Sequence, residues 1–130
     1  METKKYIKIQ DLDTYKIARQ LSKIAWEIYE VLHWQDKKTM GDQFLRATDS
    51  FGANLTEGYG RYHYLDKIKF YYNSRASLME ANDYWVELLY ERKKVEIEKC
   101  QVYKKIAKKC SIKLQNMISS AYKAKSNNKL

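Results

Sequence analysis

The sequence predicts an all-α fold, a single antiparallel four-helix bundle. The chain has 130 residues, which is the size of one domain that buries a core without disulfides or metals. It contains no proline and only four glycines, and its apolar residues recur at three- and four-residue steps in four segments. Short polar connections between these segments favour up-down-up-down packing, because they place successive helices side by side and antiparallel.

The first two helices are expected over residues 13–33 and 40–58. Asp11 or Asp13 is the expected N-cap of the first. Its apolar stripe consists of Leu21, Ile24, Ala25, Ile28 and Leu32. The polar stretch 33–39 interrupts the period and predicts a connection. The second stripe consists of Met40, Phe44, Ala47, Phe51 and Leu55 and ends at Gly58 and Gly60.

The third and fourth helices are expected over residues 66–92 and 96–122, and the tail 123–130 is expected to fray. The third apolar stripe consists of Ile68, Tyr72, Leu78, Met79, Trp85, Val86 and Leu89. The fourth consists of Val102, Ile106, Cys110, Leu114, Met117, Ile118 and Ala121. All four segments belong to one domain, residues 1–130.

Several classes of protein are excluded by what the sequence lacks. No run of about 18 apolar residues exists and the start lacks the apolar stretch of a signal peptide, so a cytoplasmic protein without a membrane span is expected. Cys100 and Cys110 fall on one helix about 15 Å apart, so free thiols are expected. His33 and His63 fall in different loops without neighbouring ligands, so neither a metal nor a cofactor is expected.

Positive charge is concentrated at the end of the chain. Residues 1–90 contain 13 basic and 13 acidic side chains, whereas residues 91–130 contain 12 basic and 3 acidic ones, which accounts for the whole net charge of +9. The predicted contacts form a basic ridge on the fourth helix, Lys104, Lys105, Lys108, Lys109 and Lys113, and a basic connection before it, Arg92, Lys93 and Lys94. Such a surface favours salt-dependent, largely sequence-independent binding to nucleic-acid phosphates. A solvated helix face is the alternative.

The turn 59–64, YGRYHY, places three tyrosines beside Arg61 and His63. Aromatic rings beside a cation can stack on unpaired bases. Packing of the rings on the end of the bundle is the alternative, and the sequence favours it because tyrosines occur throughout the chain.

A polar stripe lies beside the apolar stripe of the second helix, at steps of three and four residues. It consists of Gln43, Arg46, Ser50, Asn54, Glu57 and Arg61, and Ser77 and Glu80 lie on a similar line of the third helix. Three interpretations remain, in decreasing order: a structural hydrogen-bond network, a subunit interface, and an active site built on Glu57 or Glu80. Because no histidine is at helical spacing from the stripe, no catalytic residue is assigned and no enzymatic activity is expected.

The stretches QFLRATDSFGANLTEGYGR (43–61) and SRASLMEA (74–81) resemble the double signature of the bacterial four-helix-bundle family of 23S rRNA intervening-sequence proteins. The matching residues are Gln43, Arg46, Ala47, Ser50, Asn54, Glu57, Gly58, Arg61, Ser77, Leu78 and Glu80. Leu55, Ser74 and Ala76 depart from the usual Ile, Ala and Gly, and the proline common before the second helix is missing. The Ala-for-Gly change can alter how closely two helices approach.

The resemblance implies a small cytoplasmic bacterial protein that assembles into a ring-shaped homopentamer. Distant relatives include the accessory variability proteins of diversity-generating retroelements, which bind a reverse transcriptase and nucleic acid through a basic surface. The expected function is therefore that of a non-enzymatic, oligomeric nucleic-acid-binding accessory protein, which assists a reverse transcriptase or binds structured RNA. A protein–protein interaction scaffold is the alternative.

Overall fold

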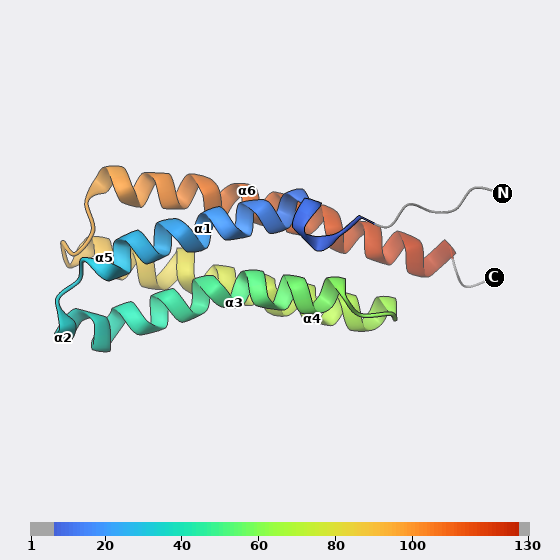
Figure 1. Ribbon diagram of the computed structural model, residues 1–130, viewed down its shortest axis with the longest axis horizontal. Coiled ribbons are helices and arrows are strands. Elements are labelled where there is room, and N and C mark those ends of the chain that lie inside the picture. Colours follow the sequence, from blue (N-terminus) through green and yellow to red (C-terminus); the bar gives the residue numbers. More distant parts are fainter. Residues whose placement is uncertain (1–6, 128–130) are drawn as a thin grey trace.

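The computed structural model describes residues 7–127, which form helices and connections without a strand (Figure 1). The elements are η1 (Ile9–Asp11), α1 (Asp13–Glu30), α2 (Trp34–Asp36), η2 (Lys37–Gly41), α3 (Asp42–Tyr59), α4 (Tyr64–Met79), η3 (Glu80–Trp85), α5 (Val86–Glu91) and α6 (Ile97–Asn127). Because α2, η2 and α3 are continuous, as are α4, η3 and α5, they combine with α1 and α6 into four helical rods.

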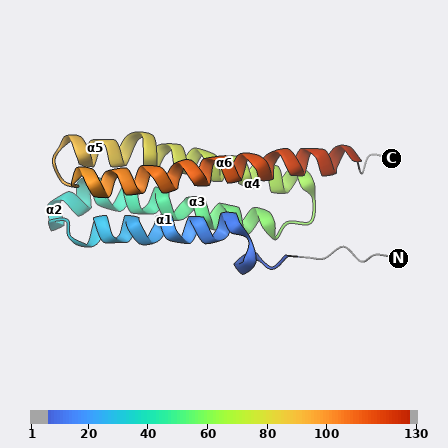
Figure 2. The same ribbon diagram turned by 90° about the horizontal axis from the view of Figure 1, so that it is seen from above.

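The four rods lie parallel to one axis, as Figures 1 and 2 show from two directions. α3 packs against both α1 and α4, and α6 packs against the same two helices from the other side. Short connections reverse the chain between successive rods, so neighbours run antiparallel. The predicted all-α, up-down-up-down four-helix bundle is confirmed.

The connection between the first two rods is much shorter than the predicted 33–39. α1 ends at Glu30 and the next helix already begins at Trp34, with His33 as its N-cap residue. The imidazole Nδ1 of His33 accepts a hydrogen bond from the Gln35 amide at 3.3 Å, which supports this early start. The stretch is polar because it is the largely exposed first turn of a helix, not because it is a loop.

Two turns of π-helix, η2 and η3, interrupt the regular apolar period of the second and third rods. In η2 the Asp42 amide donates to the Lys37 carbonyl, and in η3 the Val86 amide donates to the Ala81 carbonyl, each five residues back. A π-turn inserts one residue and rotates the following side chains relative to the preceding ones. This insertion accounts for the five-residue step between buried Ala81 and buried Val86. Tyr72 and Met79, both expected in the core, are exposed for another reason, because each lies one residue beyond a buried position, Tyr71 and Leu78.

The helix ends differ from the predicted ones by a few residues. The N-cap of α1 is Leu12, without a side-chain hydrogen bond, so neither Asp11 nor Asp13 has the predicted role. The third rod begins at Tyr64 and ends at Glu91. α6 continues to Asn127, so residues 123–127 are helical and not frayed, whereas 128–130 lie outside the described residues.

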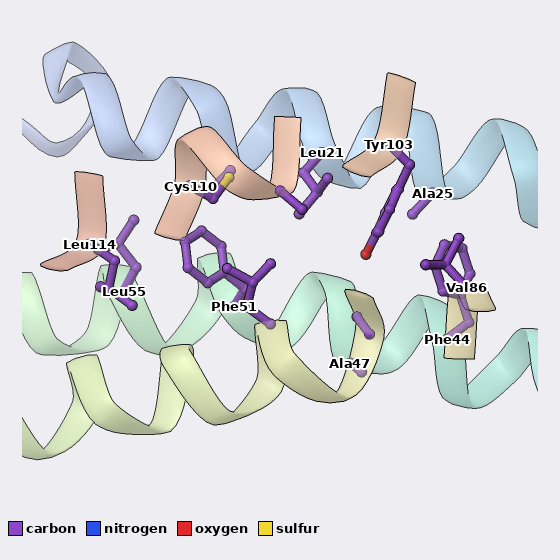
Figure 3. Close-up of a cluster of buried hydrophobic side chains, with 14 of the residues drawn as sticks. Leu21, Ala25, Phe44, Ala47, Phe51, Leu55, Val86, Tyr103, Cys110 and Leu114 are labelled. Atoms are coloured by element: carbon purple, nitrogen blue, oxygen red, sulfur yellow. The ribbon is translucent and has the colours of Figure 1, made fainter. Parts of the chain in front are cut away.

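The core runs along the centre of the bundle and draws on all four rods (Figure 3). The second apolar stripe is buried as predicted. On α6 the core residues are Cys100, Tyr103, Ala107, Cys110, Leu114, Ile118 and Ala121. Val102 was expected among them but is 44% exposed, because Tyr103, the largest fully buried side chain, takes the inward position.

Gly58 allows α3 and α4 to approach closely near their shared turn. A Cβ atom built at this position would lie 2.8 Å from the Cβ of Phe70 and 2.9 Å from the Cε1 of Tyr71. We expect Gly58→Ala to lower the free energy of unfolding by about 1–3 kcal/mol, because overpacking forces neighbouring side chains or backbone to shift. Urea unfolding measures this loss. Gly52→Ala is the control, since its nearest atom would lie at 3.5 Å, and an equal effect of both changes would contradict the steric explanation.

Candidate nucleic-acid interface and polar face

The centre of the basic ridge points away from the core of the bundle. Lys105, Lys108 and Lys109 are exposed on α6, and none forms an ion pair with another residue of the described range 7–127. From Lys99 onward α6 carries no acidic side chain. These three ammonium groups are therefore placed to meet an anion from solution.

The two flanks of the ridge are engaged within the protein. The Lys104 ammonium lies 2.5 Å from a Glu87 carboxylate oxygen and donates to the Asn82 carbonyl at 3.0 Å. In an α-helix the Val86 amide would donate to that carbonyl, but in η3 it donates to Ala81 instead. The Lys104 ammonium thus replaces the backbone amide that the Asn82 carbonyl loses in the π-turn. On the other flank of the ridge, the Lys113 ammonium lies 3.7 Å from the Asp13 carboxylate.

The basic connection forms a tight turn at one end of the bundle. The Lys93 and Lys94 amides donate to the Tyr90 and Leu89 carbonyls, the pattern of a Schellman motif, with Lys93 at a φ of 60°. The Lys94 ammonium lies 3.2 Å from the Asp36 carboxylate. Arg92 and Lys93 are exposed, so two of the three predicted phosphate contacts in this turn face solvent without an ion pair in residues 7–127.

Part of the polar stripe joins α3 to α4. The hydroxyls of Ser50 and Ser77 lie 3.0 Å apart, and the Asn54 amide donates to the Ser50 hydroxyl at 2.9 Å and to its carbonyl at 3.0 Å. Deeper in the same seam, buried Ser74 donates to the Phe51 carbonyl at 2.8 Å. These bonds correspond to the predicted structural network.

The rest of the stripe faces outward. Gln43 and Arg46 are exposed and form no hydrogen bond or ion pair with residues 7–127. Glu57 pairs with Arg61 at 3.3 Å, and Glu80 accepts a hydrogen bond from the Trp85 indole at 2.7 Å. Because both carboxylates are exposed and occupied by local partners, their surroundings do not resemble an active site that desolvates and activates an acid or a base.

The tyrosine-rich turn divides its rings between the bundle and solvent. Tyr59 is half-buried and donates its hydroxyl to the Ile7 carbonyl, while the Lys67 ammonium donates to the Tyr59 carbonyl at 2.7 Å. Tyr62 is 88% exposed and its ring meets His63 edge-on, with centroids 5.1 Å apart. The turn therefore packs one ring on the end of the bundle and leaves another accessible.

The remaining titratable candidates lie in the core or stand alone. Cys100 and Cys110 are free and buried as predicted, and burial raises the pKa of the Cys110 thiol to about 12. Within residues 7–127 no three His, Cys, Asp or Glu side chains are grouped so that they could hold a metal ion. No helix of the described part is long and apolar enough to cross a membrane.

Three basic side chains outside the predicted basic ridge lie on the outer face of α1. Lys16, Arg19 and Lys23 are exposed, and no acidic residue occurs between Asp13 and Glu27. The charge count over residues 1–90 concealed them, because acidic residues elsewhere in that stretch cancel them in the sum. Their spacing of three and four residues was the signal that would have shown a common basic face.

Known proteins resemble this chain in family pattern and in fold. The family model described as 23S rRNA-intervening sequence protein matches residues 10–119. The crystal structure of a protein of unknown function from the S23 ribosomal protein family of Bacteroides thetaiotaomicron is similar in fold. It aligns with a TM-score of 0.74 and 21% sequence identity, over 81% of this chain and 97% of that one. No protein with a curated function matches at a significant level.

Proposed function

This chain belongs to the 23S rRNA-intervening sequence protein family, and from that premise we propose that it is a non-enzymatic, oligomeric accessory protein that binds nucleic acid. The observation that carries the proposal is the cluster of Lys105, Lys108 and Lys109, which are exposed and form no ion pair within residues 7–127, on a helix that itself carries no acidic side chain from Lys99 onward. Phosphates release condensed counterions when such lysines neutralise them, which favours binding without base readout.

Charge reversal on the ridge tests the proposal. We expect Lys105→Glu with Lys108→Glu to weaken binding of a labelled RNA about tenfold or more at about 50 mM salt, with a reduced salt dependence. Fluorescence anisotropy over a salt series measures both quantities. The matched control is Lys38→Glu with Lys69→Glu, which changes the net charge equally at exposed positions of η2 and α4. Equal losses in both variants, or no RNA or DNA binding by the unaltered protein, would refute the proposal.

We propose further that the protein assembles into a ring-like homopentamer and that the outward part of the polar stripe packs between subunits. Arg46 supports this, because it belongs to the resemblance to the family yet has no polar partner in residues 7–127 of one chain. Conversely, Ser50 and Ser77 already satisfy each other within the chain.

Arg46→Glu is expected to dissociate the oligomer while the helix content and the fold of the subunit persist, because Arg46 is exposed in the isolated chain. Light scattering coupled to size exclusion measures the mass, which for five copies of 15.6 kDa is about 78 kDa. Lys69→Glu on the outer face of α4 is the control. A monomeric unaltered protein would remove the pentamer from the proposal, and a pentameric Arg46→Glu variant would remove this residue from the interface.

The distant resemblance to accessory variability proteins extends the proposal to a partner, a reverse transcriptase of a diversity-generating retroelement. Structured RNA is the partner if the gene lies in an rRNA insert. Co-purification from the native host, with and without ribonuclease, distinguishes the two. Retention of a reverse transcriptase after ribonuclease treatment would support the first branch, and recovery of RNA alone would support the second.

One surface feature favours the alternative function, a protein–protein interaction scaffold. A groove of about 500 Å³ between α4 and α6 is lined by Met79, Ile112 and Arg75, and the two apolar side chains are both 54% exposed. Exposed apolar side chains beside charge are typical of protein contacts. Met79→Asp would abolish binding of a protein partner in this case and leave RNA binding unchanged.

A further inference from the structure

The outer faces of α1 and α6 form one continuous basic surface. The two helices run side by side and antiparallel in both views (Figures 1 and 2), and two ion pairs between them show their register: Lys113 with Asp13 and Lys99 with Glu27. Lys16 is three residues after Asp13 and Lys109 is four residues before Lys113, so this register places them at the same level of the bundle.

Between these two ion pairs the surface contains only basic charge. Along about 21 Å of helix, neither α1 nor α6 has an acidic residue between the paired positions. The exposed cations of this stretch are Lys16, Arg19, Lys23, Lys105, Lys108 and Lys109. The ion pairs therefore delimit a cationic surface, which has the like-charged character of a polyanion site rather than the mixed charge of an ordinary solvated face.

An aromatic ring stands at one side of this surface. Trp26 is 51% exposed, and Tyr29 lies against it with ring centroids 5.5 Å apart, which holds the indole at the surface. A single shallow depression is lined by Lys16, Arg19, Lys23 and Trp26 together, and also by Glu27, whose carboxylate is paired with Lys99. Arg19 is itself held in place, because its guanidinium donates to the Tyr15 hydroxyl at 2.8 Å.

We propose that the α1/α6 surface binds single-stranded nucleic acid, with lysines of both helices on its phosphates and an unpaired base stacked on Trp26. This inference rests on the proposed function and names its site and its substrate. A half-exposed indole beside clustered cations is the combination that single-strand binding requires, because every unpaired base offers a π-face to an aromatic ring. A duplex keeps its bases stacked inside and would use the cations alone.

The α1 contribution is tested by Lys16→Glu with Lys23→Glu in the full chain, measured with a labelled 15-nucleotide oligo(U) at several salt concentrations. We expect affinity to fall about tenfold or more and the slope of log affinity against log salt to shrink by about 1.4, the equivalent of two lost phosphate contacts. Lys38→Glu with Lys69→Glu is the matched control, expected to change affinity less than about twofold. An effect of the α1 pair no larger than the control overturns the inference.

The stacking contribution is tested by Trp26→Ala, with Trp34→Ala as the control at an exposed tryptophan outside this surface. We expect Trp26→Ala to weaken oligo(U) binding about 5- to 150-fold and Trp26→Tyr to restore most of it, while binding of a 15-base-pair duplex stays unchanged. Oligo(U) should also quench tryptophan fluorescence in the unaltered protein and not in Trp26→Ala. Equal or tighter binding of the duplex by the unaltered protein overturns the single-strand assignment.

These outcomes separate the inference from the proposed function. If Lys105→Glu with Lys108→Glu abolishes binding but the changes at Lys16, Lys23 and Trp26 have no effect, nucleic-acid binding stands and the α1/α6 site is refuted. If the unaltered protein binds neither oligo(U) nor the duplex at about 50 mM salt, both are refuted. Circular dichroism of each variant shows that a loss of binding is not a loss of fold.

Discussion

Replacing Tyr103 by alanine is expected to lower the free energy of unfolding by about 3–5 kcal/mol, the range for removal of a buried aromatic ring. Tyr103 is fully buried in α6, and its ring packs against Phe44 of α3 with centroids 5.1 Å apart. Figure 3 shows its hydroxyl directed from α6 toward α3. The change would therefore leave a cavity at the centre of the bundle, and urea unfolding measures the cost.

Substitutions at Tyr103 and at its hydrogen-bond partner Thr48 distinguish the contribution of the tyrosine ring to stability from that of its hydroxyl group. Thr48 donates to the Phe44 carbonyl at 3.0 Å, so the Tyr103 hydroxyl, 2.7 Å from Thr48 Oγ1, acts as the donor to it. Tyr103→Phe leaves Thr48 satisfied and should cost only about 0.5–1.5 kcal/mol, whereas Thr48→Val leaves the buried tyrosine hydroxyl unpaired and should cost about 1–3 kcal/mol. A Tyr103→Phe variant as unstable as Tyr103→Ala would contradict the cavity explanation.

Alkaline pH is expected to unfold the protein steeply. Burial raises the pKa of Cys110 from 9.0 to about 12, and burial also raises the pKa of Tyr103 above its usual value of 10.0. Between the unfolded and folded values the native state holds a proton that the unfolded chain has lost, so stability falls with rising pH. The loss begins near pH 9 with about 1.4 kcal/mol per pH unit for Cys110, and Tyr103 adds a similar slope above pH 10.

Denaturant unfolding at a series of pH values from 7 to 11, with a reductant that keeps both thiols free, measures this slope. Cys110→Ala removes one titrating group, so the slope between pH 9 and 10 should decrease by up to about 1.4 kcal/mol per pH unit. This prediction concerns the slope of stability against pH. The absolute stability of Cys110→Ala is lower at every pH, because the substitution leaves a small cavity. An unchanged slope in Cys110→Ala would show that other groups dominate the alkaline transition.

The fold followed from the sequence wherever a long apolar period was uninterrupted. The stripe from Met40 to Leu55 is buried as predicted. The failures have two causes: a fixed step of 3.6 residues does not allow the five-residue step from Ala81 to Val86 across a π-turn, and Met79 and Val102 were placed in the core although each lies one residue from the buried position. A π-turn inserts one residue into a helix, so the segments on its two sides are in different rotational phase and one fixed period does not fit both.

The candidate site was predicted less completely than the fold. The sequence identified the exposed lysines of α6, but it could not distinguish Lys105 from Lys104, whose ammonium is bound by Glu87 and by the Asn82 carbonyl. It likewise grouped Ser50 with Arg46, although one bonds across α3 and α4 while the other faces solvent. Both differences depend on contacts between helices, and the spacing of residues along one helix does not reveal such contacts.

By itself the sequence determined the helical class, the four segments and the excess of positive charge in α6, because each depends on residue type and spacing along the chain. Only the tertiary structure decided which side chains of neighbouring helices form a common surface. Packing of α1 against α6 brought Lys16 and Lys23, from a stretch without net charge, beside Lys105 and Lys109. A net charge counted along the sequence does not show how charges are arranged on the folded surface. An anion interacts with that surface, which forms only when the helices pack together.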